Sequence, residues 1–597
     1  MKQFLLTMAG VFAGLVIFLI GIPFLLIVMA ASATRAPATP AHAVLQLDLR
    51  QEITDQDAQN PLIAFNGGGL SVMSIIETLR KAETDDRVKA VFVRLPEGGI
   101  APAAADELRE AFWHFRKVGK KPIWAYSQGL YPSGIVTSTY MLGAATDQFW
   151  MQPSSSFQAT GIATDDIFFK RAFDKYGVTP QYQQRYQYKN AVNPYLYSDY
   201  TPAHREAQLS WMGSIYRSAI LTAAADRHKE PNAFLKTVEA GPYSAEQAMA
   251  AGLIDRVGQE HDAEVALKAA TDKHAEFVDF NDYAARVKHV DKAASAMNVG
   301  SAIAVIGGEG PIMTGTDESS NPFSGGQTIY SDDFAGAIYD AIDDKEVKAI
   351  VLRVSSPGGS DTASEQILAA VRAAKAAGKP VVISMGTYAA SGGYWISSQA
   401  SEIVAQPTTL TGSIGVFGGK FVLSDALGKF GVDMRHLTVG GDYASAFGPD
   451  QKFTPQQEAA FSGWMDRIYA GFVQRVADGR KLPVARVQEI AKGHVWTGVQ
   501  GKSLGLVDHL GGFYDAVDRA KALAGLKGEV RLKHMRATAS PFDVFQRALG
   551  VSSSSVKTLA ASAWLLGDPR SQAIMDELMQ ARLRSQGATV LAPTPVR

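Results

Sequence analysis

The sequence contains a long internal repeat, and this repeat constrains the fold more than any other feature. Residues 89–94 (Lys-Ala-Val-Phe-Val-Arg) match residues 348–353 (Lys-Ala-Ile-Val-Leu-Arg), and each segment is followed by a Gly-Gly pair, a helical pattern and an apolar run. Three further pairs keep nearly the same separation, of 254, 254 and 253 residues: Pro153 with Pro407, Gly177 with Gly431, and Asp255 with Asp508. Such constant spacing predicts two copies of one fold.

Each copy alternates short β-branched runs with Ala-rich helical segments. In the second copy, residues 302–306, 349–354 and 381–385 indicate strands, and residues 362–377 indicate a helix. This alternation predicts an α/β fold with a mainly parallel sheet in each copy. We expect four regions after the amino terminus: a first repeat at 42–275, a connecting helix at 276–300, a second repeat at 301–535, and a tail of unknown role at 536–597.

The first 41 residues carry a candidate membrane anchor. Phe4 to Ala31 is uncharged and apolar, long enough to cross a hydrocarbon core of about 30 Å, and an Ala/Pro/Thr linker follows it. We predict one transmembrane helix; the alternative is a cleavable signal peptide, since Ala31-Ser32-Ala33 has small residues at the required spacing. Lys2 precedes the apolar run, so the positive-inside rule favours a cytoplasmic amino terminus and places the repeats outside the cytoplasm.

The composition excludes several classes of function. The chain of 597 residues has a formal net charge of -1 and no basic block, so nucleic acid is not an expected partner. It has no cysteine, which rules out disulfides, thiolate metal sites and a cysteine nucleophile. There is no His-Glu-x-x-His and no nucleotide-binding loop, so we predict neither a metal nor a cofactor.

Two turns in the second copy are candidates for chemistry. One is Pro357-Gly358-Gly359, whose glycines permit backbone N–H groups to point into a cleft. The other places Ser391 between a small-residue strand and a helix, directly before Gly392. A serine at a helix start is also a common helix cap, and that structural role is the alternative for Ser391.

These motifs resemble those of the signal peptide peptidase A family, of the long, two-repeat type. The resemblance rests on Ser-Pro-Gly-Gly-Ser at 356–360, Ala-Ala-Ser-Gly-Gly-Tyr at 389–394 and Thr-Gly-Ser-Ile-Gly-Val at 411–416, and it extends over residues 1–535. It implies tandem crotonase/Clp-like ββα-spiral repeats and a serine peptidase with a Ser-Lys dyad. Ser391 matches the nucleophile, Lys189 the general base, and Ser413 the accessory serine that orients the lysine amine. We expect Gly359 and Gly392 to supply the oxyanion-binding N–H groups, with Gly358 as an alternative donor.

The repeat provides a separate argument for one composite site. The counterpart of Ser391 in the first copy is Thr137, and the counterpart of Lys189 in the second copy is Ala444. Each copy therefore supplies one member of the pair. The sequence leaves open whether the two meet within one chain or across a subunit boundary.

A lysine that acts as a base must be neutral. The reference pKa of lysine is about 10.4, so a useful base near pH 7.5 requires the pKa of Lys189 to fall by roughly 3 units. Burial in an apolar cleft has this effect, and Tyr186, Tyr188, Val192 and Tyr195 are suitable neighbours.

The family resemblance also implies substrates and surroundings. We expect the enzyme to degrade cleaved signal peptides and other short hydrophobic peptides at the bacterial inner membrane, on the periplasmic side, as a homo-oligomer that the resemblance makes a tetramer. The alternatives are a Ser-His-Asp hydrolase using His436, an acyl-CoA enzyme on the crotonase scaffold, and a non-catalytic membrane scaffold.

Overall fold

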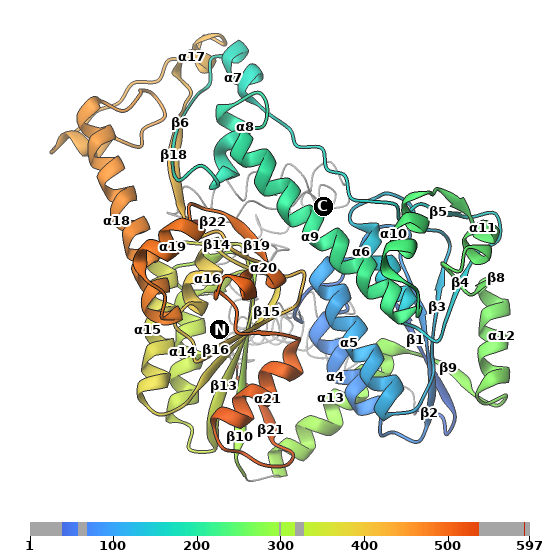
Figure 1. Ribbon diagram of the computed structural model, residues 1–597. Helices are drawn as coiled ribbons and strands as arrows, with labels where there is room; N and C mark the ends of the chain where they lie inside the picture. The colour runs from blue at the N-terminus through green and yellow to red at the C-terminus, as the bar shows by residue number, and fades with distance from the viewer. Residues whose placement is uncertain (1–38, 58–68, 298–299, 317–326, 536–589, 592–597) are drawn as a thin grey trace, which may run out of the picture.

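Two mainly parallel sheets, one from each copy of the repeat, form the frame of the molecule. The computed structural model describes residues 39–57, 69–297, 300–316, 327–535 and 590–591. In Figure 1 the first copy is blue to green and the second is yellow to orange, and helices α4 and α5 lie between their sheets. The predicted mixed α/β fold is confirmed.

The first sheet is entirely parallel, with the strand order β8-β4-β3-β2-β1-β9. Its strands are β1 (Ala43–Asp48), β2 (Val88–Arg94), β3 (Ile123–Ser127), β4 (Gln148–Met151), β8 (Arg256–Val257) and β9 (Glu276–Asp279). The helices of this copy are α4 (Val72–Ala82), α5 (Pro102–Val118), α6 (Val136–Ala144), α9 (Pro202–Asp226), α10 (Pro231–Glu239), α11 (Ala245–Ala250), α12 (Glu260–Ala270) and α13 (Phe280–Met297).

The second sheet has the order β19-β17-β15-β13-β10-β21, with β16 beside β15 and β20 beside β16. Its strands are parallel except β19, which pairs antiparallel with β17. Its strands are β10 (Ala302–Glu309), β13 (Val347–Ser356), β15 (Val381–Ala390), β16 (Glu402–Ala405), β17 (Leu410–Gly412), β19 (Val495–Thr497), β20 (His509–Leu510) and β21 (Arg531–His534). Its helices are α14 (Ser331–Asp343), α15 (Asp361–Ala376), α16 (Gly392–Ser397), α18 (Pro455–Arg480), α19 (Val484–Ile490), α20 (Gly498–Ser503) and α21 (Phe513–Leu523).

Equivalent residues in the two copies make the same hydrogen bonds. The Tyr140 hydroxyl donates to the Leu253 carbonyl at 3.0 Å, and the Tyr394 hydroxyl donates to the Leu506 carbonyl at 3.0 Å. A second matched contact is an arginine–aspartate pair near the end of each copy: Arg227 with Asp255 at 2.8 Å, and Arg480 with Asp508 at 2.5 Å. The sequence repeat is therefore also a repeat of local structure.

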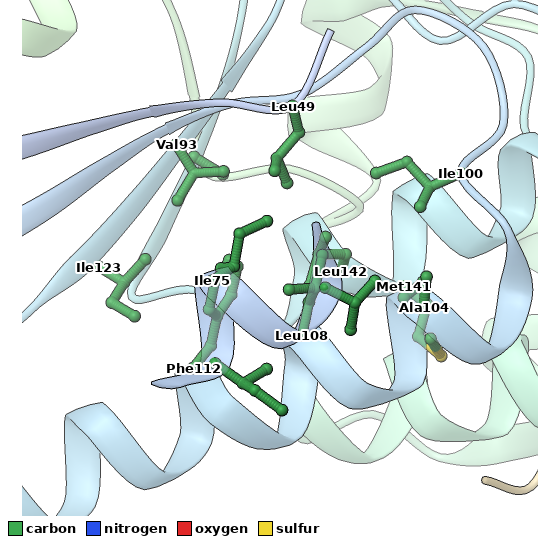
Figure 2. Packing of buried hydrophobic residues seen from close by; sticks show 14 of the residues in the cluster. Leu49, Ile75, Val93, Ile100, Ala104, Leu108, Phe112, Ile123, Met141 and Leu142 are labelled. Atoms are coloured by element: carbon green, nitrogen blue, oxygen red, sulfur yellow. The ribbon is translucent and has the colours of Figure 1, made fainter. Parts of the chain in front are cut away.

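The hydrophobic cluster of the first copy extends into the second copy, which also has a large cluster of its own. Figure 2 shows Leu108 and Phe112 of α5 facing Val93 and Ile123 from strands β2 and β3. The same cluster of buried side chains includes Val305, Val351 and Val382 from the second sheet. Because α4 and α5 are buried between the sheets, removing water from their apolar side chains stabilises the fold of each copy and the contact between the copies together.

A buried ion pair also joins the copies. Arg353, on β13 in the second copy, is 1% exposed and contacts Asp55 at 2.5 Å and Glu107 of α5 at 2.7 Å. A third carboxylate, Glu309, accepts the backbone N–H groups of Asp55 and Gln56, and burial raises its pKa to about 7. Two first-copy carboxylates thus supply the counter-charge for a cation that the second sheet could not bury alone.

A two-stranded ribbon crosses from one copy to the other above the sheets. Strand β6 (Thr179–Arg185) of the first copy pairs antiparallel with β18 (Val416–Val422) of the second, from Arg185 opposite Val416 to Thr179 opposite Val422. After β6 come the short helices η2 (Asn190–Val192) and α8 (Asn193–Leu196). The ribbon brings the chain around Lys189 to the second copy.

The region 276–300, expected as a connecting helix, begins with β9, which is the edge strand of the first sheet beside β1. The expected transmembrane helix at 4–31 lies outside the described residues. Of the helices in the described ranges, none combines the length and the apolar character that crossing a bilayer requires.

Candidate active site

Ser391 stands at a sharp turn between β15 and α16. Its backbone has φ 56° and ψ −116°, which is unusual for a residue with a side chain. The Ser391 N–H donates to the Gly412 carbonyl at 2.8 Å, and the Ser391 carbonyl accepts the Trp395 N–H at 2.8 Å. These bonds hold the turn, so the hydroxyl is presented at the carboxyl end of a parallel strand, where α/β proteins commonly bind ligands.

Gly392 allows the Ser391 turn to approach the Pro-Gly-Gly turn closely. A Cβ atom on Gly392 would lie 3.0 Å from the Gly359 nitrogen and 2.8 Å from Ser364 Oγ. The Gly392 N–H belongs to the first turn of α16, where no intrahelical acceptor exists. The N–H groups of Gly359 and Gly392 therefore lie on adjoining backbone segments, as two donors to one oxyanion must.

The alternative donor, Gly358, has a bond of its own. Its N–H donates to Ser356 Oγ at 3.1 Å. Both glycines belong to β14 (Gly358–Gly359), in which Gly359 lies opposite Ile312 of β11 (Ile312–Met313), but the bond to Ser356 Oγ occupies the N–H of Gly358 alone. This arrangement favours Gly359 over Gly358, although the oxyanion role of all three glycines stays a prediction.

Lys189 reaches Ser391 within one chain. Lys189 Nζ lies 2.7 Å from Ser391 Oγ, 2.9 Å from Ser413 Oγ and 2.9 Å from the Ser413 carbonyl oxygen. All three residues are fully buried. The structure therefore brings together the lysine of the first copy and both serines of the second. In the sequence, Ser391 lies 202 residues and Ser413 lies 224 residues after Lys189.

Burial holds the pKa of Lys189 well below its usual range, because the charged ammonium loses its hydration and no acidic group among the described residues opposes the effect. The three oxygen neighbours suit a neutral amine. Its two N–H groups can donate to the carbonyl and the hydroxyl of Ser413, which leaves the nitrogen lone pair to accept the Ser391 O–H. The same site can also hold the amine after it has taken up a proton, because the three N–H groups of the ammonium can donate to the same three oxygens.

A third segment, Lys492 to His494, packs against the lysine and was not singled out in the sequence. Gly493 lies against the backbone of Lys189, and the His494 carbonyl accepts the Ser413 N–H at 2.7 Å. The sequence signal was only an isolated glycine before a histidine. Nothing in such a dipeptide indicates a contact with a residue more than 300 positions away.

An extended segment pairs with the Pro-Gly-Gly turn. Strand β22 (Val590–Leu591) runs antiparallel to β14, with Leu591 opposite Gly358 and Val590 opposite Gly359. In Figure 1, β22 lies beside β14 and above α16. The edge of β14 thus pairs with an extended segment of the same chain, which is the geometry of strand addition.

The other candidates from the sequence lie elsewhere. His436 is on an exposed loop, where its Nδ1 pairs with Asp450. The side chain bonded to Ser391 Oγ in the described residues is Lys189. Within the described ranges, no group of three or more histidine, aspartate or glutamate residues is arranged to hold a metal ion.

Comparisons with known proteins identify two segments of the chain that match one peptidase family. Two segments, 115–274 and 373–527, match Peptidase family S49; the first contains Lys189 and the second contains Ser391 and Ser413. Protease 4 of Salmonella typhi is 34% identical over 516 residues, which cover 82% of this chain and 79% of the relative.

Two more distant similarities concern shorter segments. A protein of Enterococcus faecium named putative signal peptide peptidase SppA is 34% identical over 179 residues, or 30% of this chain and 52% of the relative. A solved structure, a mutant of the 1510-N membrane-bound stomatin-specific protease, is 15% identical with a TM-score of 0.25, and covers 40% of this chain and 99% of its own.

Proposed function

Because the chain belongs to peptidase family S49 and is a serine peptidase, we propose that Ser391 is its nucleophile and Lys189 its general base. The observation that carries this proposal is the 2.7 Å contact between Lys189 Nζ and Ser391 Oγ. It occurs in a fully buried site where the pKa of the amine is lowered. A neutral amine in hydrogen-bond reach of a hydroxyl is the arrangement that activates a serine.

In the proposed reaction, the Lys189 lone pair takes the Ser391 proton as Oγ bonds to the carbonyl carbon of the substrate. The oxyanion that forms accepts the N–H groups of Gly359 and Gly392. The Lys189 ammonium then gives its proton to the leaving amine, the C–N bond breaks, and an acyl-Ser391 ester remains. Water attacks this ester and loses a proton to Lys189; the returning Ser391 Oγ takes that proton back as the acid product leaves.

The substrates in this proposal are short, extended, hydrophobic peptides, including the remnants of cleaved signal peptides. The pairing of β22 with β14 supports a backbone bound antiparallel to Gly358–Gly359, beside the Ser391 turn. The name of the Enterococcus faecium relative supports the choice of signal peptides. A hydrophobic peptide would reach such a site most directly from a membrane surface.

The proposal includes an architecture and a location. The repeats would be two Clp/crotonase-like units, anchored at the inner membrane by residues 4–31 with the site on the periplasmic side. The uncharged run from Phe4 to Ala31 supports the anchor. Deleting 4–31 should release the protein from washed membranes, and a homo-oligomer, which we propose as a tetramer, should be visible by mass photometry.

The central test uses full-length protein in detergent and a fluorophosphonate probe. Ser391→Ala should abolish labelling, and Lys189→Met should slow it about 100-fold or more, since general-base catalysis contributes roughly 10²–10⁴. His436→Ala should label normally. The wild type should also cut a synthetic signal peptide, with products identified by mass. A folded wild type that neither labels nor cuts would overturn the proposal, and one that hydrolyses only acyl-CoA would favour the crotonase alternative.

A further inference from the structure

The turn Lys492–Gly493–His494 lies between the segment that carries Lys189 and the segment that carries Ser413. On one side, the Lys492 carbonyl accepts the N–H groups of Tyr186 at 3.2 Å and Tyr188 at 3.1 Å. Both donors belong to the first copy and flank the proposed base. The turn, which belongs to the second copy, thus holds the lysine segment by its backbone.

On its other side, the same turn holds the segment of the accessory serine. The Gly493 N–H donates to the Ile414 carbonyl at 2.9 Å, and the Ser413 N–H donates to the His494 carbonyl at 2.7 Å. Three consecutive residues therefore fix both partners of the Lys189–Ser413 contact. The distance between the Lys189 amine and the Ser413 oxygens therefore depends on how closely the two segments pack against this turn, which we call the thickness of the turn.

Gly493 makes that thickness minimal. Its φ is +84°, and a Cβ atom there would lie 2.4 Å from the Lys189 nitrogen and 2.5 Å from the Lys189 Cβ. These neighbours are not the flexible end of a side chain, so they cannot move aside without moving the lysine. Gly415 also packs against this turn, because a Cβ atom on Gly415 would lie 2.8 Å from the Gly493 Cα and 2.5 Å from the Arg185 carbonyl oxygen. The backbones thus stack at distances that only glycine permits.

The side chains around the turn keep water from this contact. The His494 ring is stacked on Trp496 with centroids 3.7 Å apart, and it lies 4.5 Å from the Tyr188 ring. Burial lowers the pKa of His494, so the ring carries no charge near the amine at neutral pH. The titratable groups on the packed elements also include three tyrosines, Tyr186, Tyr188 and Tyr469 of α18. The charged groups there are Lys492 and Glu206 of α9, and Glu206 approaches His494 Nε2 to 3.7 Å.

From these contacts we infer that Gly493 is a positioning residue for the reaction. The turn it forms sets the distance of the Lys189 amine from Ser413 and Ser391 and keeps the amine dry. This inference rests on the proposed role of Lys189 as the base. On this inference, a turn of the second copy sets the position of the Lys189 side chain, which the first copy supplies.

The test is the pH dependence of fluorophosphonate labelling in full-length Gly493→Ala. The added methyl group should displace Lys189 and admit water, so the amine regains hydration and its pKa rises. We expect labelling at neutral pH to slow about tenfold or more, and the rise of the rate with pH to move up by about one unit, since one unit of pKa is a tenfold change in the neutral fraction.

Gly378→Ala is the matched control. Gly378 has φ +77°, nearly that of Gly493, but a Cβ atom there would meet nothing within 4 Å. This variant suffers the same left-handed strain without the contact. It should lose stability and keep the pH midpoint of the wild type. A purely structural role for Gly493 would make the two variants alike.

Gly415→Ala decides the matter if Gly493→Ala does not fold. Gly415 has an ordinary φ, and its added methyl group would press on the backbone of Gly493 and on the carbonyl oxygen of Arg185. An upward shift of the midpoint in either folded variant supports the inference. A folded variant that labels with the wild-type midpoint overturns it, while the proposed function stands as long as the wild type labels at Ser391. A wild type that does not label overturns the proposed function itself.

Discussion

Ser413→Ala tests how the amine of Lys189 is oriented. The Ser413 hydroxyl is fully buried and lies 2.9 Å from Lys189 Nζ, and the carbonyl oxygen of the same residue lies 2.9 Å from the amine. Without the hydroxyl, one N–H of the neutral amine has no acceptor in a site closed to water. An unsatisfied buried donor costs about 1–3 kcal/mol, so labelling of Ser391 should slow by roughly 10- to 100-fold.

The same substitution has a signed effect on pH dependence. The ammonium form loses an acceptor too, and hydrogen bonds from charged donors are the stronger ones. The already lowered pKa of Lys189 should therefore fall further. Because the neutral amine is the base, the rise of the labelling rate with pH should move to lower pH, although the plateau is lower.

Rates of fluorophosphonate labelling measured across pH would reveal both effects. Ser398→Ala is the matched control: Ser398 is also fully buried, and its hydroxyl donates to the Trp395 carbonyl at 2.8 Å. That variant should lose about 1 kcal/mol of stability and label like the wild type. The reasoning is refuted if Ser413→Ala keeps the wild-type plateau, or if its pH midpoint moves upwards.

Three further outcomes concern stability. Lys189→Met should raise the thermal midpoint at neutral pH, because burial disfavours the charged amine of the wild type. The wild type should gain stability as pH rises from the lowered pKa of Lys189 towards about 10.4, the value in the unfolded chain. Calorimetry should show this gain in the wild type and not in Lys189→Met. Arg353→Met should lower the free energy of unfolding by about 3–5 kcal/mol, because Asp55 and Glu107 stay buried without a counter-charge. The control is Arg372→Met, at a partly exposed pair with Glu365, which should change stability by less than about 0.5 kcal/mol. Equal effects of the two substitutions would contradict this prediction. Glu110→Gln should stabilise the protein above pH 8. Burial and the neighbouring Asp515 raise the pKa of Glu110 to about 8, so the wild type loses stability as pH rises from about 4.5 through 8. Equal pH dependence of the melting temperatures of wild type and variant would argue against this prediction.

The sequence predicted those parts of the site that leave a local or repeated signal. The repeat separates Lys189 from Ser391 by copy, and the small residues around Ser391 predicted the strand-to-helix turn. The alternation of β-branched runs with Ala-rich helical segments predicted the α/β class. Each of these features is visible within a few neighbouring residues.

The parts that the sequence did not predict depend on contacts between distant segments. Gly493 is defined by its approach to Lys189, and an isolated glycine gives no indication of that partner. Asp55 and Glu107 lie in the first copy and acquire their role only when Arg353 of the second is buried against them. Arg353 itself did carry a signal, since it interrupts an apolar strand, and a charge at such a position indicates a buried partner.

The joining of the two copies has a consequence for biosynthesis. On the proposed mechanism, a growing chain that has been synthesised as far as Lys189 still lacks its nucleophile. A chain synthesised as far as Ser391 still lacks two elements that hold the lysine segment: strand β18, which pairs with β6, and the turn at Lys492–His494. A ribosome must therefore make more than four-fifths of the chain before any hydrolysis can begin. The order of synthesis alone therefore keeps the unfinished peptidase inert.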